Sequence, residues 1–386
     1  MANAVQRNAE KVEIGRTALR SVAALLGVAG IVVGVLSGCT EDKPGVAGSG
    51  IGGTSGLRGP GKVGVVLPDT TSSQRWERQD ARHLQSAFAA AGVPVDIENA
   101  HGDRARFVKI AEDMISEGAR VLIIANLDSS SGKAALDLAR AASVKTIDYD
   151  RLTLNGGADY YVSFDNRKVG ELQARVLKDC LGEKGYRNPV IAELNGSETD
   201  NNASLFKEGY DAVLQPMYDA ALYTKGPDQW VPGWREMDAV AIFDQMLSQQ
   251  PRIQGVLAAN DGIANAVIGV LKRKGRGGKV PVTGQDATVR GLQNVLAGDQ
   301  CMTVFKDPKA QAELAAKLAI TLYNGRAPDV EKVIKDPESG IYLPFVRLTP
   351  RAITKADVKQ LIAADSVDRA EICVPDLAQE CERAGI

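Results

Sequence analysis

Charged side chains stand where one apolar stretch of the sequence ends. The segment TIDYDR (146–151) begins like a buried strand and then runs into two carboxylates, a tyrosine and an arginine, which are poor residues for a strand interior. Two interpretations are open. Either the strand ends at a surface turn where acid and base pair, or it presents Asp150 and Arg151 to a ligand. We expect Asp148 to be structural.

The same pattern recurs after other predicted strands. The polar residues that follow them are Asp69 and Arg75, Asn260 and Asp261, Gln285 and Asp286, and Lys306. For Asp69 and Asp261 we expect helix capping rather than ligand contact, because Asp is a favoured N-cap. Arg151 and Lys306 cannot cap an N-terminus, so for them the alternative to ligand contact is a surface salt bridge.

Two further segments add amides and aromatic rings. In GSETDNNASLF (196–206), one residue of the run Asp200, Asn201 and Asn202 can cap a helix, which leaves carboxylate and amide groups to spare. The segment DQWVPGW (228–234) adds Trp230 and Trp234, and a ring exposed from such an irregular loop would offer an apolar face. Carboxylates accept from hydroxyls, guanidinium and ammonium groups donate to them, and amides do both. This combination predicts a neutral, polyhydroxylated ligand.

The sequence does not favour catalysis, a metal or a cofactor. Asp150, Asp200 and Asp286 could serve as the acid and base of a glycosidase, but basic and amide partners would keep these carboxylates ionised. There is no GxSxG motif, no Cys–His arrangement and no CxxC motif, and the chain has 2 histidines. We therefore predict a protein that is not an enzyme, with no catalytic residues, no metal site and no cofactor.

Short β-branched runs alternate with amphipathic stretches from Lys62 onward, which predicts a parallel sheet built from βαβ units. A first series spans 62–163 and a second begins at 164, so we expect an α/β fold with two doubly wound lobes. The strand expected at 341–350 exceeds what the second lobe needs. The chain is therefore expected to cross back between lobes and form a hinge.

The first residues have the features of an export signal. Basic residues precede the apolar run VAALLGVAGIVVGVLSG (22–38), as in secretory signals; the alternative is a single membrane-spanning anchor. The run ends in LSGC, which resembles a bacterial lipobox, and that resemblance implies cleavage before Cys39 and lipidation of its sulfur. The Gly- and Ser-rich residues 39–61 would then form a flexible tether.

The remaining cysteines and the net charge give further expectations. Outside the cytoplasm, Cys373 and Cys381 are disulfide candidates, whereas the sequence leaves open whether Cys180 and Cys301 pair. The 386 residues carry 46 basic and 48 acidic side chains, a net charge of -2 without a basic block. We therefore expect no nucleic-acid partner.

An ordered set of motifs carries a resemblance over residues 62–350. They are RWERQDARHL, YDR, SFDNRKVGELQA, DNNASLF, DQWVPGW, AND, GQDAT and MTVFKDP. Together they resemble the D-xylose-binding branch of the type I periplasmic sugar-binding proteins of bacterial ABC importers. The resemblance implies two α/β lobes joined by three hinge strands, with the sugar in the cleft. The ligand residues that it implies are Arg75, Asp150, Arg151, Asp200, Asn202, Trp230, Asn260, Asp286 and Lys306.

The resemblance also implies the lobe boundaries and, with the lipobox, the role; the cysteine-bearing tail departs from the family pattern. The expected first lobe spans 62–163 and about 307–335, the second 164–306 and about 336–352, and a cysteine-bearing tail 353–386. The chain would be a monomeric lipoprotein on the outer face of the cell membrane that delivers a monosaccharide, D-xylose, to the permease and ATPase subunits of an importer. The alternative is a receptor that presents glucose, galactose or a broad range of sugars to a membrane sensor. The loop PDTTSSQ (68–74) departs from the family pattern and leaves the exact sugar open.

Overall fold

The computed structural model describes residues 61–386, which belong to one compact unit. The expected signal segment, the lipidated Cys39 and the tether lie outside the described residues. Within residues 61–386, no helix combines the length and apolar character that a membrane crossing requires.

A seven-stranded sheet forms the first lobe, in the order β10-β11-β5-β4-β3-β1-β2. All neighbouring strands are parallel except β10, which is antiparallel to β11. The strands are β1 (Lys62–Leu67), β2 (Val95–Asn99), β3 (Ala119–Ile124), β4 (Lys145–Tyr149), β5 (Tyr160–Phe164), β10 (Val333–Lys335) and β11 (Tyr342–Leu348).

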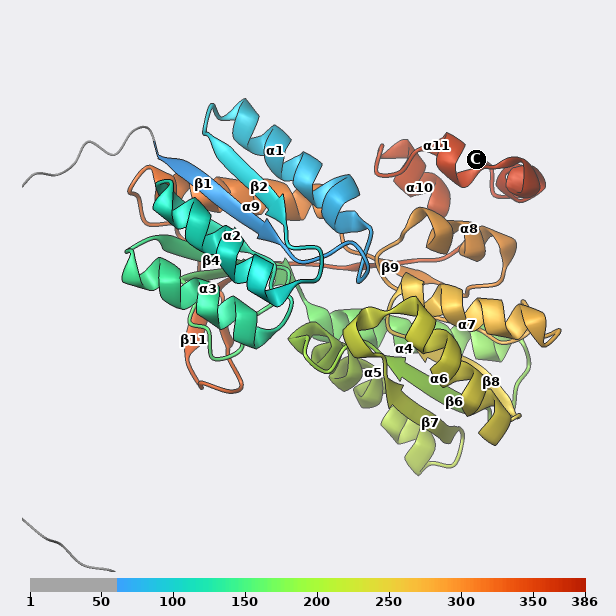
Figure 1. The fold of residues 1–386 in the computed structure, drawn as a ribbon. Helices are drawn as coiled ribbons and strands as arrows, with labels where there is room; N and C mark the ends of the chain where they lie inside the picture. Colours follow the sequence, from blue (N-terminus) through green and yellow to red (C-terminus); the bar gives the residue numbers. More distant parts are fainter. Residues whose placement is uncertain (1–60) are drawn as a thin grey trace, which may run out of the picture. The chain divides into compact units, whose positions relative to one another are not determined.

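Helices cover both faces of this sheet because successive strand residues point to opposite sides. In β1, Val66 packs with α2 (Arg104–Ser116) and α3 (Ser129–Ala141), whereas Val65 packs with α1 (Ala81–Ala90) and α9 (Pro308–Tyr323). Figure 1 shows α2 and α3 together on one side of the strands. The first lobe is therefore doubly wound, as the alternating sequence pattern predicted.

The second lobe has a parallel sheet of order β7-β6-β8. Its main elements are α4 (Asn166–Glu183), β6 (Val190–Asn195), α5 (Asn201–Asp219), β7 (Thr224–Trp230), α6 (Glu236–Gln249), β8 (Ile253–Ala258), α7 (Asp261–Arg273) and α8 (Val289–Ala297). A short antiparallel pair joins β9 (Thr303–Phe305) to β12 (Arg351–Ile353). The chain passes between the two lobes three times, after β5, after β9 and after β11.

Two expectations about strands were wrong. Residues 336–352 were assigned to the second lobe, but β11 pairs in parallel with β5 of the first, and Phe345 stacks on Tyr161 with ring centroids 4.8 Å apart. The segment that holds Trp230 was expected to be an irregular loop, but β7 runs from Thr224 to Trp230. Trp230 therefore ends a strand rather than lying in an irregular loop.

The tail packs on the second lobe. Its helices are α10 (Val358–Ala363), α11 (Arg369–Ile372) and α12 (Ala378–Arg383), and Leu361 and Ile372 share an apolar cluster with Leu292 of α8. A disulfide joins Cys373 to Cys381 within the tail. A second disulfide, between Cys180 of α4 and Cys301 just before β9, resolves the pairing that the sequence left open.

Helices α4 and α5 approach closely where glycines face the neighbouring backbone. A methyl group at Gly170 of α4 would overlap the backbone carbonyl of Phe206 in α5. We expect Gly170→Ala to lower the free energy of unfolding by about 3 kcal/mol, because two helix backbones would have to separate. Urea denaturation measures this difference.

Gly182 provides the matched control on the same helix. A methyl group there would meet no atom within 4 Å. Gly182→Ala should be neutral or stabilise the protein by up to about 1 kcal/mol, because alanine restricts the unfolded chain and favours the helix. Equal destabilisation by both substitutions would contradict close helix packing as the cause.

Candidate functional site

Side chains from both lobes line a small inner cavity of about 30 Å³, which is room for roughly one or two water molecules. The inner cavity is lined by Ser72, Ser73, Arg75, Trp76, Asp150, Arg151, Asp200, Asn202, Phe206, Trp234, Asn260, Gln285, Asp286 and Lys306. Eight of the nine ligand residues predicted from the sequence are in this list. A sugar ring therefore requires these side chains, or the lobes, to move apart.

Asp150 lies at the centre of the inner cavity, directly after β4. Its carboxylate accepts from Arg75 Nη1 at 3.3 Å, Lys306 Nζ at 3.1 Å and Asn202 Nδ2 at 3.1 Å. Burial alone would raise the pKa of Asp150, but the charges of Lys306, Arg75 and Arg151 outweigh it and lower the pKa to about 2. The site therefore holds an ionised carboxylate at neutral pH.

The backbone of Asp150 is unusual. Its φ is 64°, in the left-handed region that Asn and Asp enter more readily than other non-glycine residues. The hydroxyls of Tyr161 and Ser163 both donate to its carbonyl oxygen, at 2.9 and 2.7 Å. These contacts with β5 fix the turn, so the carboxylate points into the inner cavity instead of continuing the strand.

Arg75 and Trp76 form one wall. The guanidinium of Arg75 makes two 2.7 Å hydrogen bonds to Asp80, and its Nη2 also donates to Gln311 at 2.8 Å. The ring of Trp76 lies 5.0 Å from the Arg75 guanidinium and 5.3 Å from that of Arg151. Arg75 is thus held in place by Asp80 and Gln311, which do not line the inner cavity, and both cations lie against the ring of Trp76.

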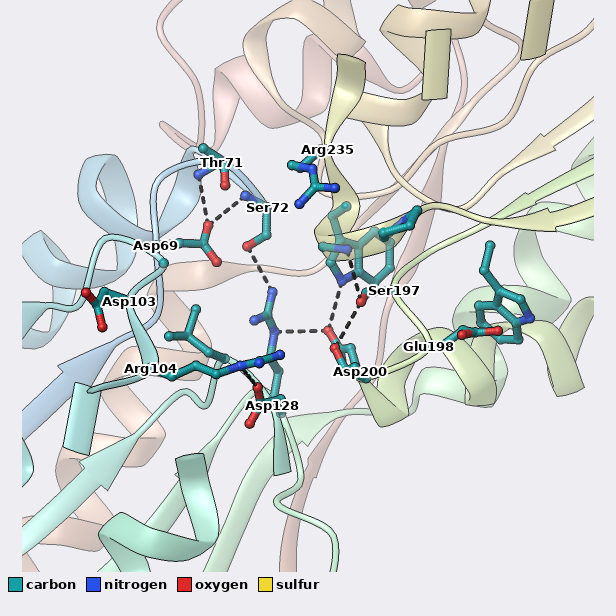
Figure 2. A pocket seen from close by; sticks show the side chains of 18 of the residues that line it. Asp69, Thr71, Ser72, Asp103, Arg104, Asp128, Ser197, Glu198, Asp200 and Arg235 are labelled. Atoms are coloured by element: carbon teal, nitrogen blue, oxygen red, sulfur yellow. Dashed lines mark hydrogen bonds and ion pairs between the residues drawn. The ribbon is translucent and has the colours of Figure 1, made fainter. Parts of the chain in front are cut away.

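The opposite wall belongs to the second lobe. Asp200 caps α5 by accepting from the backbone N–H of Asn202, and its second oxygen lies 3.0 Å from Arg151 Nε. Burial raises the pKa of Asp200, although the charge of Arg151 opposes this. Trp234 Nε1 donates to the same carboxylate at 3.2 Å, and Figure 2 shows dashed contacts that meet at Asp200. An ion pair therefore joins the lobes.

Two more contacts join the lobes through the loop 68–74. Ser73 Oγ donates to Asp286 at 3.0 Å, and Asn260 Nδ2 donates to the carbonyl oxygen of Ser72 at 3.2 Å. Burial raises the pKa of Asp286, against the charge of Lys306. The loop that departs from the family pattern thus reaches across to the second lobe.

The capping expectations for Asp69 and Asp261 were wrong. Asp69 closes a turn by accepting from the backbone of Thr71 and Ser72, and it caps no helix. Asn260 caps α7, so the neighbouring Asp261 does not. The side chain of Asp261 is instead fully buried and accepts from Thr288, Gln300 and Thr303; its pKa rises to about 7, mainly because of burial.

The aromatic prediction was also wrong in part. Trp230 does not line the inner cavity; it is half-buried at the end of β7 and lines a larger neighbouring cavity. Trp234, from the same segment, takes its place together with Trp76 and Phe206. Trp76 follows Arg75 where a helix begins after β1, within the motif RWERQDARHL, and that position was the signal in the sequence for its role.

Asp148, which the sequence marked as structural, has no exposed side chain and accepts from the backbone and hydroxyl of Thr153, both at 2.7 Å. It does not line the inner cavity. Burial raises its pKa to about 7. The unfolded carboxyl releases its proton near pH 3.9, so the folded state binds more protons between about pH 4 and 7.

The free energy of unfolding should therefore fall as pH rises through this window. We expect the difference in that free energy between the unmodified protein and Asp148→Asn to shrink by on the order of 3 kcal/mol from pH 4 to pH 7. Urea denaturation of both proteins between pH 4 and pH 7 measures this difference. The raised pKa of Asp261 also lowers the free energy of unfolding as pH rises, but it does so in both proteins and cancels in the difference. A difference independent of pH would contradict a protonated Asp148.

The described residues contain no group of three or more His, Cys, Asp or Glu side chains arranged to hold a metal ion. What the inner cavity offers instead is ionised carboxylates, fixed cations, amides and aromatic rings. Such groups can hold a neutral molecule rich in hydroxyls.

Comparison with known proteins places this arrangement in a family. Residues 63–327 match the model of the periplasmic binding protein domain. The chain is 32% identical over 305 residues to the D-xylose-binding periplasmic protein of Escherichia coli K12, covering 79% of this chain and 90% of that protein. It is 33% identical over 327 residues to the multiple sugar-binding periplasmic receptor ChvE of Rhizobium radiobacter, covering 81% and 92%.

Solved structures agree with the fold. An ABC transporter solute-binding protein from Clostridium phytofermentans, solved with β-D-glucose, matches with a TM-score of 0.74 at 27% identity, covering 80% of this chain and 99% of that one. A carbohydrate transporter solute-binding protein from Chloroflexus aurantiacus, solved with D-glucose, gives a TM-score of 0.73 at 28% identity, covering 80% and 97%. This family consists of binding proteins and not enzymes. The chain therefore belongs to the periplasmic binding protein family, with the type I fold of its sugar-binding members.

Proposed function

We propose that this protein is the extracytoplasmic binding component of an ABC sugar importer and that it captures one monosaccharide between its lobes. The observation that carries the proposal is the inner cavity, where buried carboxylates, cations and amides from both lobes meet. The proposed ligand residues are Arg75, Asp150, Arg151, Asp200, Asn202, Asn260, Asp286 and Lys306.

The contacts that join the lobes explain how a sugar could favour closure. Arg151 and Asp200 come from different lobes and pair directly at 3.0 Å. A sugar hydroxyl is both donor and acceptor, so it can bridge such a pair without leaving either group unsatisfied. Because both lobes contribute contacts only when they are together, the sugar has a higher affinity for the closed state and shifts the population toward it.

D-Xylose is the proposed ligand. The relative from Escherichia coli, named for D-xylose binding, supports it, whereas the multiple-sugar relative and the two glucose-bound structures support a hexose as the second candidate. Glucose differs from xylose by one hydroxymethyl group. Discrimination would need a steric wall against that group.

A thermal-shift experiment tests the proposed function. The chain from residue 40 onward is heated with D-xylose, D-glucose, D-galactose, L-arabinose or D-ribose. A ligand at a hundredfold excess over its dissociation constant stabilises by about 2.7 kcal/mol, which is a shift of a few degrees for a protein of this size. A shift with D-xylose alone supports the specific proposal, and a shift with several sugars supports a broad receptor. No shift with any of them would contradict the function.

We further propose that Cys39 carries a lipid that tethers a monomer to the outer face of the cell membrane, where the permease and its ATPase receive the sugar. The LSGC motif supports the anchor. A mass increase matching the lipid, lost in Cys39→Ala, would test it.

A sensor role is the second candidate. It is favoured by the 33% identity over 327 residues to a relative named as a receptor. Deleting the permease separates the two roles, because sugar-dependent transcription would survive for a sensor and transport alone would be lost.

A further inference from the structure

A second, larger cavity adjoins the inner one. This outer cavity has a volume of about 590 Å³, within the range of small-molecule sites. It shares Ser72, Arg151, Asp200 and Trp234 with the inner cavity. We propose that the outer cavity binds the second sugar unit of a disaccharide whose first unit occupies the inner cavity. This inference rests on the proposed function and specifies its substrate class.

The outer cavity is present while the lobes are in contact. The Arg151–Asp200 ion pair and the hydrogen bond from Asn260 to Ser72 both join the lobes. The space beside them therefore does not depend on separating the lobes. When the inner side chains move apart to admit one sugar unit, this adjoining space gives a second unit room between the same lobes.

The walls of the outer cavity carry charges of both signs from both lobes. The first lobe supplies Asp69, Asp103, Arg104 and Asp128, and the second supplies Glu198, Asp200 and Arg235. Figure 2 shows these side chains around the same space. Because acidic and basic groups both line the cavity, it offers acceptors and donors to a neutral ligand with many hydroxyls.

Asp128 holds Arg104 at the wall of the outer cavity. One of its oxygens caps α3 by accepting from the backbone of Ser131, and it also accepts from the hydroxyls of Ser130 and Ser131. The other oxygen is buried and forms an ion pair with the guanidinium of Arg104. The side chain of Asp128 is 7% exposed and that of Arg104 67% exposed. A sugar hydroxyl in the outer cavity can reach this pair through the exposed guanidinium, which is a hydrogen-bond donor.

Trp230 supplies an aromatic surface. It ends β7, packs partly on the core of the second lobe and lines the outer cavity. An indole face packs against the C–H face of a sugar ring. Trp230, which does not line the inner cavity, would thus hold the second sugar unit in the outer one.

The wall between the two cavities contains the groups that would meet the glycosidic bond. Arg151 donates to Ser72 Oγ at 2.9 Å and pairs with Asp200, which also accepts from Trp234. These groups lie along both cavities. A disaccharide would place its linking oxygen beside the Arg151 guanidinium, which is a donor to such an oxygen.

Calorimetric titration tests the inference with two matched pairs of probes, D-xylose with xylobiose and D-glucose with cellobiose. For the pair whose monosaccharide binds, we expect the disaccharide to bind about 10-fold more tightly. Trp230→Ala should weaken disaccharide binding about 10-fold and leave monosaccharide binding within about twofold. Arg104→Ala, at an exposed position, should weaken disaccharide binding about threefold and provides the test if Trp230→Ala does not fold.

The outcomes separate the two proposals. If a monosaccharide binds and neither disaccharide does, the outer cavity is not a sugar subsite and the proposed function stands. If Trp230→Ala and Arg104→Ala weaken both members of a pair equally, the subsite is likewise excluded. If no sugar binds, the proposed function fails and the subsite with it.

Discussion

Asp150→Asn should weaken monosaccharide binding at least about 100-fold, a loss of about 2.7 kcal/mol. The Asp150 carboxylate faces Arg75 and Lys306, and its pKa is lowered to about 2. An amide of the same shape removes the negative charge and leaves two buried cations without it. Removing one partner of a buried, hydrogen-bonded charge pair costs several kcal/mol, because the other charge stays buried without its partner.

The choice of asparagine separates charge from backbone strain. The φ of 64° at position 150 is accessible to Asn, whereas alanine would add strain at the same position. Asp148→Asn is the matched control, because it removes a buried carboxyl two residues earlier that does not line the inner cavity. Calorimetry should give a dissociation constant for Asp148→Asn within about twofold of that of the unmodified protein. A similar loss in both variants would point to a damaged fold rather than to the site.

Trp234→Ala should weaken monosaccharide binding by about 2 to 4 kcal/mol, as is typical of a buried aromatic anchor. Trp234 is 6% exposed, packs edge-on to Phe206 with centroids 6.4 Å apart, and donates to Asp200. Its removal leaves a cavity and frees the Asp200 carboxylate to shift. The free energy of unfolding should also fall, by about 3 to 5 kcal/mol.

Trp230→Ala is the control for that variant. Both tryptophans belong to one short segment, but only Trp234 lines the inner cavity. Calorimetry at a temperature where both variants remain folded compares their monosaccharide affinities. Equal losses, or a larger loss in Trp230→Ala, would contradict the assignment of the aromatic wall to Trp234.

Much of the fold could be predicted because its signals are local. Alternating β-branched runs and amphipathic helices gave the order of elements in both lobes, polar residues at strand ends gave candidate ligands, and the resemblance implied the eight of them that line the inner cavity. Strand ends in parallel sheets gather at one edge. A local pattern therefore located a site assembled from distant segments.

The errors have a common physical origin, since each depended on a direction or a pairing in space. Trp230 and Trp234 are equivalent in the sequence, and their places follow from the end of β7 and from Gly233 and Trp234, whose φ angles are 59° and 61°. The β11 strand could have paired with either lobe until its register with β5 was known.

The pairing of Cys180 with Cys301 and the burial of Asp261 also depend on segments that are distant in the sequence. Cys180 and Cys301 are 121 residues apart, and only the packing of α4 beside the chain before β9 brings them together. Asp261 looked like a helix cap because caps are local, but Asn260 takes that role and Asp261 is buried among side chains from later segments. No local pattern distinguishes the two neighbours.

The most direct test of the central claim is a crystal structure of the protein grown with D-xylose. We predict density for one sugar ring in the inner cavity, packed against Trp234, with hydroxyls within hydrogen-bond distance of Asp150 and of Arg151. A sugar bound elsewhere on the surface, with the direct Arg151–Asp200 and Lys306–Asp150 pairs intact, would contradict capture between the lobes.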